Sequence, residues 1–370
     1  MNTIEKEVIL DDSRVIMESL AQAGADTYIG YPITPSNAMY LYASQRFQYM
    51  LPAPDEISTL QYMSGLAAVG HLPVTATSFP GFALILESIN MAYMMELPMI
   101  IILTQRLGPA TGTATAGAQG DVALLRGMIS GGHPIPVVCP SSIEDCWELS
   151  AKAVQMAVKL RCPVVILSSK ERANTNRNFD ISKLKPIEPI KRTYYEGKDE
   201  YIPYKYNDSL VPEFLPVSNN KHQVRITAST HDQKGIIQHT NEEAMRNTVR
   251  LEMKINNYID QHHFYYLNKK GSDTLVVSYG ITANAAEEAV LKLEQQGKKV
   301  DFLIVKTLLP VASKINDIIH SYKKIVFAED NINGQYAKII FGDRLPNNVS
   351  FVGAIGKMLS PNEIIEGGKF

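Results

Sequence analysis

At 370 residues the chain is too long for one ordinary core, and a typical size of roughly 150 residues per domain predicts two or three domains. Its 36 basic and 38 acidic side chains give a net charge of −2, which provides no electrostatic reason to expect nucleic acid or an anionic membrane as a partner. The cysteines, Cys139, Cys146 and Cys162, form no CxxC pair, so neither a disulfide framework nor a metal or iron–sulfur site is predicted on this chain. Together with an acidic start and no long apolar stretch, this pattern predicts a cytoplasmic protein.

The first half of the chain has the pattern of an α/β domain. Up to about residue 190, short β-branched runs alternate with amphipathic stretches, which predicts βαβ units and a parallel sheet. The runs 99–104 and 163–169 are apolar on both faces, as central parallel strands are. Between them, residues 142–160 begin with Ser142 and place apolar side chains at helical spacing, so we expect a helix that covers one face of the sheet.

The pattern then changes twice. Residues 191–270 mix prolines, charges and tyrosines without a clear strand or helix period, and we expect an irregular strap between domains. Within this strap, His231 and Asp232 favour a turn or an interface role over catalysis. The alternation returns over 271–370, where runs at 273–280, 299–310, 323–330 and 349–356 predict strands and 281–297 predicts a helix that ends at Gly297. This pattern predicts a second, smaller α/β domain.

Common catalytic signatures are absent, since the chain has no GxGxxG, GxxxxGK[ST], HExxH or GxSxG motif. One unusual stretch is GYPITPSN at 30–37, in which Pro32 and Pro35 bracket Thr34. The prolines delay the next helix and hold the threonine at a strand-to-helix junction, the edge where open parallel sheets bind ligands. The alternative is structural, with Thr34 and Ser36 serving as helix caps.

Two further stretches carry candidate site residues. Asp55 and Glu56 precede a helix, where a carboxylate can hold a protonated ring nitrogen or can be stabilised by the helix dipole alone. Arg106 leaves an apolar strand and enters a loop rich in glycine, threonine and alanine, a position suited to binding a substrate carboxylate through two hydrogen bonds. The alternative for Arg106 is a surface ion pair with Asp121.

Taken in order, these stretches resemble the α subunit of 2-oxoacid:ferredoxin oxidoreductases. The matching segments are GYPITPSN, DEIS, TATSFPGFALILES, QRLGPATGTATAGAQGD, THDQKG and the domain from Gly271 to Gly356, and they cover nearly the whole chain. The resemblance implies a pyrimidine-type thiamine-diphosphate-binding domain over 1–190, followed by a transketolase C-terminal-like domain over 271–370. It also implies a β subunit that holds the diphosphate, Mg²⁺ and a [4Fe–4S] cluster, and usually a γ subunit.

The resemblance further implies roles for individual residues. Glu56 matches the glutamate that hydrogen-bonds the cofactor's aminopyrimidine ring, Thr34 the threonine that donates to the developing oxyanion, and Arg106 the arginine that binds the substrate carboxylate. The implied reaction is oxidative decarboxylation of a 2-oxoacid, with a lean toward 2-oxoglutarate, in which coenzyme A takes the acyl group and ferredoxin takes the electrons. Further cofactor contacts are expected from Pro32, Ile33, Ser78 and Phe79.

The chain departs from the family pattern at three places. Residues 11–14 read Asp-Asp-Ser-Arg where the family has Gly-Asn-Glu, Phe79 replaces the glycine of SGPG, and Ala53-Pro54 replace polar residues. A phenylalanine cannot take the positive φ that glycine allows, and it adds bulk near the expected cofactor pocket. These changes motivate an alternative, a non-catalytic assembly or regulatory paralogue that docks the β subunit.

Overall fold

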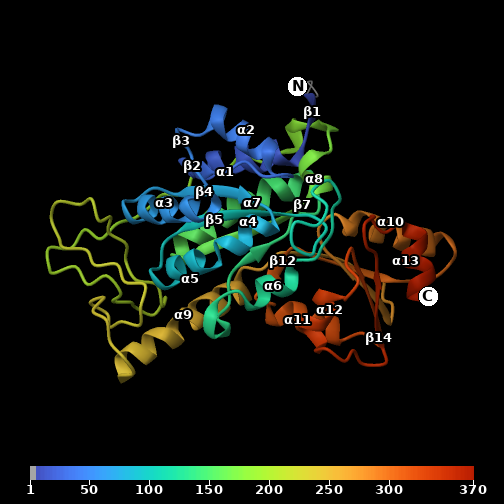
Figure 1. Ribbon diagram of the computed structural model, residues 1–370. Coiled ribbons are helices and arrows are strands. Elements are labelled where there is room, and N and C mark those ends of the chain that lie inside the picture. The colour runs from blue at the N-terminus through green and yellow to red at the C-terminus, as the bar shows by residue number, and fades with distance from the viewer. Residues whose placement is uncertain (1–5) are drawn as a thin grey trace, which may run out of the picture.

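The computed structural model describes residues 6–370 and contains three sheets (Figure 1). The large sheet is built from β2 (Thr27–Gly30), β3 (Tyr49–Pro52), β4 (Pro73–Thr77), β5 (Met99–Gln105), β6 (Val137–Val138), β7 (Pro163–Ser169) and β12 (Thr307–Leu309). Its strand order is β12-β6-β7-β5-β4-β2-β3. A separate two-stranded sheet pairs β1 (Glu7–Leu10) with β8 (Arg177–Asp180) in antiparallel fashion.

The centre of the large sheet agrees with the sequence analysis. All seven residues of β5 and of β7 are buried, and the two strands pair in parallel from Met99 opposite Pro163 to Gln105 opposite Ser169. The predicted helix is α7 (Ile143–Leu160), and its N-cap Ser142 accepts a hydrogen bond from the amide of Asp145 at 3.1 Å. The other helices of this domain are α1 (Asp12–Ala23), α2 (Asn37–Arg46), α3 (Glu56–Ala68), α4 (Phe79–Leu84), α5 (Leu86–Met94), α6 (Val122–Gly127) and α8 (Lys170–Asn174), with short 3₁₀ turns at Ser130–Gly132 and Ile181–Lys183.

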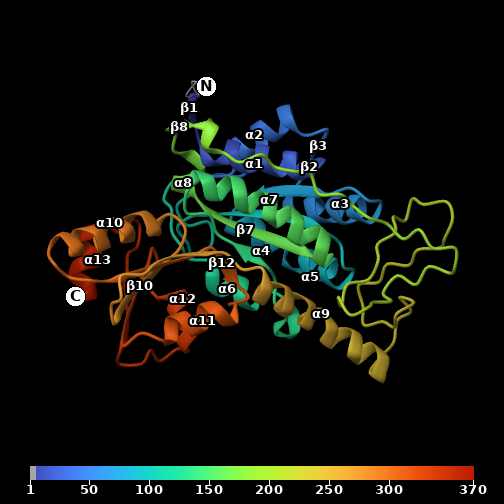
Figure 2. The ribbon, with the colours of Figure 1, turned by 180° about the vertical axis from the view of Figure 1, so that it is seen from behind.

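The second domain is smaller and lies beside the first in both views (Figures 1 and 2). Its sheet is made of β9 (Tyr265–Asn268), β10 (Thr274–Ser278), β11 (Asp301–Val305), β13 (Lys324–Glu329) and β14 (Val349–Gly353), in the order β14-β13-β10-β11-β9. Its helices are α10 (Thr282–Gln295), α11 (Ser313–His320), α12 (Gln335–Phe341) and α13 (Pro361–Gly368). No helix within residues 6–370 is long and apolar enough to cross a membrane.

The expected single strand over 299–310 is wrong. The segment forms β11 in the small sheet and then β12, which pairs antiparallel with β6 at the edge of the large sheet, with Thr307 opposite Val138. The chain therefore contributes one strand from its second half to the sheet of its first half. The two domains are therefore joined along a sheet edge as well as through the connecting segment.

The expected irregular segment is irregular only in its first part. Residues 191–240 form loops at one end of the molecule, after which α9 (Glu242–Gln261) runs back toward the second domain (Figures 1 and 2). Asn241 caps this helix by accepting a hydrogen bond from the amide of Ala244 at 2.9 Å. The buried side of α9 carries Leu251, Ile255 and Ile259, a helical spacing that the sequence analysis missed among the charged residues of the segment.

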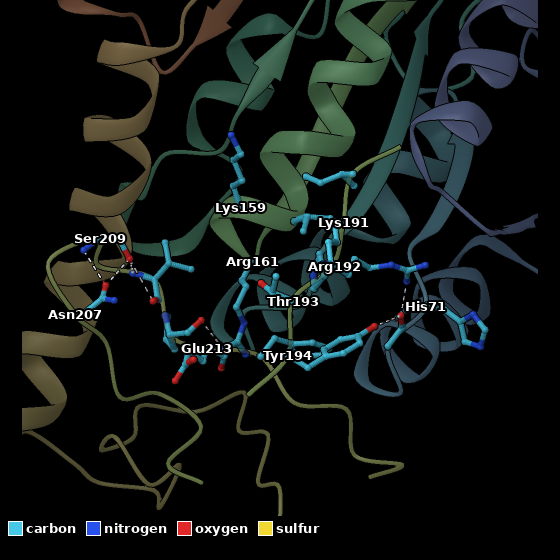
Figure 3. A pocket seen from close by; sticks show the side chains of 17 residues that line it. His71, Lys159, Arg161, Lys191, Arg192, Thr193, Tyr194, Asn207, Ser209 and Glu213 are labelled. Atoms are coloured by element: carbon cyan, nitrogen blue, oxygen red, sulfur yellow. Dashed lines mark hydrogen bonds between the residues drawn. The ribbon is translucent and has the colours of Figure 1, made fainter. Parts of the chain in front are cut away.

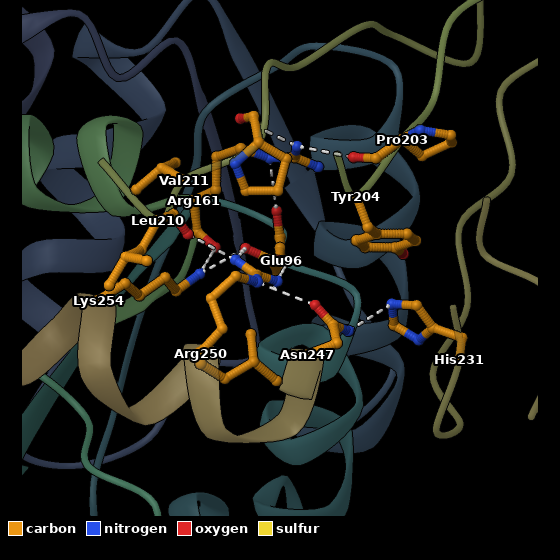
Figure 4. Close-up of polar contacts among 12 residues, drawn as sticks. Glu96, Arg161, Pro203, Tyr204, Leu210, Val211, His231, Asn247, Arg250 and Lys254 are labelled. Atoms are coloured by element: carbon orange, nitrogen blue, oxygen red, sulfur yellow. Dashed lines mark hydrogen bonds and ion pairs between the residues drawn. The ribbon is translucent and has the colours of Figure 1, made fainter. Parts of the chain in front are cut away.

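A buried cluster of charges holds α9 against the first domain (Figure 4). The carboxylate of Glu96, in the turn between α5 and β5, forms ion pairs with Arg250 and with Lys254, the latter at 2.6 Å. Burial alone would raise the pKa of Glu96, but the charges of Lys254 and then Arg250 outweigh it and lower the pKa to about 2. Glu96 is therefore ionised in the interior, and its two cations come from a helix more than 150 residues away in sequence.

Candidate functional site

The predicted site residues come together at one edge of the large sheet. Strands β2, β3, β4 and β5 are parallel, so their carboxyl ends lie at the same edge. Thr34 follows β2, Glu56 follows β3, Ser78 follows β4 and Arg106 follows β5. The topology thus places on one edge four residues that are spread over more than 70 positions of sequence.

Thr34 and Arg106 are in direct contact. Nη1 of Arg106 donates a hydrogen bond to the carbonyl oxygen of Thr34 at 2.8 Å. The Thr34 hydroxyl accepts a hydrogen bond of 3.3 Å from Nδ2 of Asn37, and Nδ2 of Asn174 donates to the Pro35 carbonyl at 3.3 Å. The turn is therefore held by its own helix, by the end of β5 and by α8. Beside it, Pro32 is exposed and Ile33 is half-buried.

The capping alternative for this turn is not what the structure has. Ser36 occupies the N-cap position of α2 but forms no side-chain cap. Its hydroxyl, buried with the residue, is instead 3.0 Å from the carbonyl oxygen of Thr77 and 3.0 Å from the hydroxyl of Thr104. Ser36 therefore links the Thr34 turn to the ends of β4 and β5. These are the strands that Ser78 and Arg106 follow directly.

The two neighbouring carboxylates Asp55 and Glu56 have different surroundings. Asp55 is the N-cap of α3 and accepts a hydrogen bond from the amide of Ser58 at 2.7 Å. Glu56 is the first residue of the helix and is half-buried, and its side chain has no hydrogen bond or ion pair to any residue of 6–370. Since Asp55 already caps the helix, the carboxylate of Glu56 is left available.

Gly81 and Ser78, at the start of α4, are the next two residues of the site. A Cβ added to Gly81 would collide with Oε1 of Glu56 and with Oγ1 of Thr77, so only glycine allows α4 to come this close. Ser78, which precedes α4, is fully buried, and its hydroxyl has no hydrogen-bond partner among the described residues. A buried hydroxyl without a partner is costly unless a bound molecule satisfies it.

Phe79 adds bulk here but no backbone strain. It is the first residue of α4 and is not among the non-glycine residues with positive φ in the described chain. The expected cost of replacing glycine at this position therefore does not arise. The half-buried ring lines a cavity that also contains Arg106.

This cavity, of about 340 Å³, lies between the two domains. One wall is the loop after β5, including Arg106 and Asp121, and the other consists of residues 330–333, 335, 354 and 355 of the second domain. Arg106 and Asp121 are 7% and 6% exposed, and Nε of the first and Oδ2 of the second are buried without a partner among the described residues. No ion pair joins them within residues 6–370, so the predicted alternative of an Arg106–Asp121 pair is wrong.

Asp121 is electrostatically unusual in this cavity. Burial raises the pKa of its carboxyl group to about 7, because the charged form loses its hydration. Although Asp121 precedes α6, its side chain does not cap that helix. The sequence analysis considered Asp121 only as a partner for Arg106 and missed it as an independent cavity residue.

The sequence analysis also missed Gln119, which anchors the loop to the second domain. Its side chain donates to the carbonyl oxygen of Tyr279 and accepts hydrogen bonds from the hydroxyl of Thr282 and the amide of Asp330, each at 2.9 Å. Its backbone amide donates to the carbonyl oxygen of Asp330 at 2.8 Å. The strand–helix turn at 280–282 thus binds a side chain of the first domain.

The unusual residues 11–14 have a structural role. Asp11 caps α1, and the buried carboxylate of Asp12 forms an ion pair with the buried guanidinium of Arg172 on α8. The neighbouring Glu171 accepts a hydrogen bond of 2.9 Å from the amide of Gly117 in the loop that carries Arg106. Asp12 therefore fixes the helix that supports both this loop and the Thr34 turn.

A second cavity of about 450 Å³ is basic but lies at the opposite edge of the sheet (Figure 3). His71 precedes β4 and Arg161 precedes β7, so this cavity is at the amino ends of the strands. Its arginines are engaged: Arg161 donates to the carbonyl oxygen of Glu213 at 2.9 Å, and Arg192 pairs with Asp26 at 2.8 Å. The cavity shares no residue with the Arg106 cavity.

Comparison with known proteins identifies the family of the chain. The family model for pyruvate flavodoxin/ferredoxin oxidoreductase, thiamine-diphosphate-binding, matches residues 18–251. The 2-oxoglutarate synthase subunit KorA of Methanocaldococcus jannaschii is 28% identical over 368 residues, which are 98% of each chain. The recognised resemblance is thereby confirmed.

Two solved structures show the same fold. One is a 2-oxoglutarate:ferredoxin oxidoreductase from Magnetococcus marinus with 2-oxoglutarate, coenzyme A and succinyl-CoA bound, which has a TM-score of 0.92 at 23% identity. The match covers 99% of this chain and 65% of that one, so the chain spans just under two thirds of its length. A split-gene transketolase has a TM-score of 0.55 at 15% identity, with 97% of this chain and 95% of that chain covered. The expected thiamine-diphosphate-binding α/β fold with a transketolase-like arrangement is confirmed.

Proposed function

The chain belongs to the pyruvate flavodoxin/ferredoxin oxidoreductase family through its thiamine-diphosphate-binding domain, and from this we propose that it is the α subunit of a 2-oxoacid:ferredoxin oxidoreductase. The proposed reaction converts a 2-oxoacid, with 2-oxoglutarate favoured, to acyl-CoA and CO₂, and passes the electrons to ferredoxin. The observation that carries the proposal is the contact between Arg106 and Thr34 at the sheet edge that also bears Glu56.

Thiamine diphosphate, when bound, supplies the ring that accepts the electron pair left by the departing CO₂. Glu56 would accept or share a proton at a ring nitrogen of the aminopyrimidine, a role that its lack of protein partners leaves open. Thr34 would donate to the 2-oxo oxygen of the substrate as negative charge grows there. Arg106 would bind the carboxylate that is lost and orient the bond that breaks.

The residues around Glu56 fit the aminopyrimidine part of this cofactor. The hydroxyl of Ser78 is buried without a partner among the described residues, and Gly81 allows α4 to approach the Glu56 carboxylate closely. We expect Pro32, Ile33 and Phe79 to complete the contacts with the ring. Buried polar groups without partners are rare in folded proteins, so the unpartnered Ser78 hydroxyl supports a bound ligand here.

The proposal assigns the remaining groups to other subunits. Within residues 6–370 no cluster of three or more histidine, cysteine, aspartate or glutamate side chains is arranged to hold a metal, and the three cysteines are buried and free. The family resemblance supports the proposal that a β subunit holds the diphosphate, Mg²⁺ and the [4Fe–4S] cluster, and that a γ subunit completes the complex. Exposed apolar side chains beside the site suit a covering partner; these are Tyr31, Leu51, Ile57 and Leu84.

The alternative of a non-catalytic docking paralogue was motivated by Phe79 and by residues 11–14. Phe79 starts a helix with ordinary backbone angles, and Asp12 supports α8 through its ion pair with Arg172. Both departures therefore have a structural explanation that leaves Glu56, Thr34 and Arg106 in place. The catalytic proposal is accordingly preferred.

The deciding experiment is 2-oxoacid-dependent reduction of a viologen dye by the chain purified with its natural partners. We expect activity in the wild type and a loss of roughly 10²-fold to 10⁴-fold in Glu56→Gln, the range for a general acid–base group. The matched control is Asp55→Asn, which keeps the helix cap and should keep the activity. If the wild-type complex, loaded with cofactor and cluster, reduces no dye with pyruvate, 2-oxoglutarate or branched 2-oxoacids, the catalytic proposal is wrong and the docking role replaces it.

A further inference from the structure

We propose that Asp121 determines substrate specificity, by binding in its protonated form the second carboxylate of a dicarboxylic 2-oxoacid whose first carboxylate is held by Arg106. This inference rests on the proposed function and adds to it the residue and the protonation state that would select a dicarboxylic 2-oxoacid. Asp121 would touch only the end of the substrate that does not react, so its role is recognition.

The geometry isolates Asp121 as the free acid of the cavity. Its amide is 3.2 Å from Oε1 of Gln105 at the end of β5, which fixes its backbone beside the residue that precedes Arg106. Oδ2 of Asp121 is buried and has no partner among the described residues. The other carboxyl group in the lining, that of Asp330, is already engaged, because its Oδ1 accepts a hydrogen bond from the amide of Leu359 at 2.9 Å.

Arg106 provides the complementary half of the site. One Nη group is used by the Thr34 carbonyl, while Nε is buried and unpartnered in the described structure. A ligand in the cavity would thus meet a cation and an uncommitted carboxyl group at two places along the same wall, the loop after β5. A carboxylate at each end of the ligand satisfies both only if Asp121 carries a proton, since two ionised carboxylates repel each other.

The charges around the cavity are compatible with a protonated Asp121. The charged or titratable groups that its walls present are Arg106 from the end of β5 and Asp330 from the segment after β13, while Arg126 lies on the adjoining helix α6 and Glu171 is held by the Gly117 amide. None of them forms an ion pair with Asp121 within residues 6–370. Burial places the pKa of Asp121 at about 7, and an anion bound against it would raise that pKa further.

This arrangement predicts that a dicarboxylic ligand binds together with a proton. At pH 8 a group with a pKa of about 7 is roughly 90% ionised, so binding should take up nearly one proton per site. A monocarboxylic ligand, which meets only Arg106, should bind without that uptake. A hydrogen bond between a carboxyl group and a carboxylate is charge-assisted. Removing the Asp121 side chain should therefore measurably lower the affinity for the dicarboxylic ligand.

The test uses the complete complex and two ligands that cannot be decarboxylated, 2-hydroxyglutarate and lactate. Isothermal titration calorimetry at pH 8 in two buffers of different ionisation enthalpy gives the number of protons taken up on binding. We expect close to one proton for 2-hydroxyglutarate and none for lactate. In Asp121→Asn the uptake should vanish while 2-hydroxyglutarate still binds within a few-fold of wild type, because the amide can donate in place of the acid.

Asp121→Ala is the matched variant without a donor. It should weaken 2-hydroxyglutarate by roughly tenfold or more and leave lactate unchanged. Binding of 2-hydroxyglutarate without proton uptake, equal uptake for both ligands, or no binding of 2-hydroxyglutarate would each overturn the inference. The proposed function fails separately, through the absence of dye reduction with every 2-oxoacid, including pyruvate.

Discussion

Arg106 and Thr34 are 72 residues apart in sequence and are joined by one hydrogen bond of 2.8 Å, from Nη1 of the arginine to the carbonyl oxygen of the threonine. The bond connects the turn after β2 to the end of β5. Between these two strands lies β4, which is followed by Ser78. It also fixes the guanidinium, so that the remaining N–H groups of Arg106 are oriented before a substrate arrives.

Replacing Arg106 by lysine should therefore lower kcat/KM for 2-oxoacids by roughly 100-fold, or about 2.7 kcal/mol. An ammonium group is a point charge on a flexible chain, and it cannot hold the Thr34 carbonyl and bind a carboxylate through two parallel bonds at once. Steady-state dye reduction by the complex measures the change. A lysine variant within threefold of wild type would show that Arg106 does not bind the substrate.

Gln119→Ala should destabilise the contact between the domains and loosen the loop that carries Arg106. The substitution leaves buried groups of Tyr279, Thr282 and Asp330 without their partner, at about 1–3 kcal/mol for such a site. We expect a lower free energy of unfolding in urea and a higher KM for the 2-oxoacid. Gln335→Ala is the control, since this half-buried side chain also bridges the domains, through Gly120 and Ala123, but should cost less.

Glu96→Gln should lower the free energy of unfolding by about 3–5 kcal/mol, because it leaves Arg250 and Lys254 as uncompensated buried cations. The same carboxylate predicts a pH dependence. Its pKa is about 2 in the folded chain against 4.5 for the free side chain, so its contribution is present above about pH 4.5 and is lost as the pH falls toward 2. Urea titrations across this window should show a shallower decline in the variant, and equal slopes would contradict the assignment.

His231 should make the strap sensitive to mild acid. Nδ1 is 2.7 Å from the carbonyl oxygen of Ser229, which can only accept, so in the neutral ring Nε2 accepts from Nδ2 of Asn247 at 3.2 Å. Burial lowers the pKa of His231, with Arg250 acting in the same direction and Glu96 and Asp232 against it. His231 is therefore protonated at a higher pH in the unfolded chain than in the folded one. Its contribution to the free energy of unfolding is fully present above pH 6.5 and falls as the pH drops below that value.

Hydrogen exchange of the amides at 225–240 measures this effect. After correction for intrinsic rates, the free energy of opening should fall with pH below 6.5, by at most about 1.4 kcal/mol per pH unit. His231→Gln, which cannot be protonated, should remove the dependence. If the opening free energy of the variant still falls with pH in the same way, a group other than His231 causes the pH dependence.

The sequence by itself determined the elements whose pattern is local. The continuous apolar runs of β5 and β7, and the Ser142 cap of α7, are visible within windows of a few residues because strand and helix periods are short. The order of the motifs also identified the family and selected Thr34, Glu56 and Arg106. Their meeting at one edge follows from the rule that parallel strands share their carboxyl ends.

The tertiary structure alone decided which groups that are distant in sequence form strand pairs, hydrogen bonds and ion pairs with one another. The strand β12 leaves its own domain to pair with β6, and α9 is stabilised by Glu96, more than 150 residues away. Asp121 became distinct only when two domains closed a cavity around it, since burial is what raises its pKa. Burial and long-range pairing depend on contacts made by the whole chain, and no local period of the sequence encodes them.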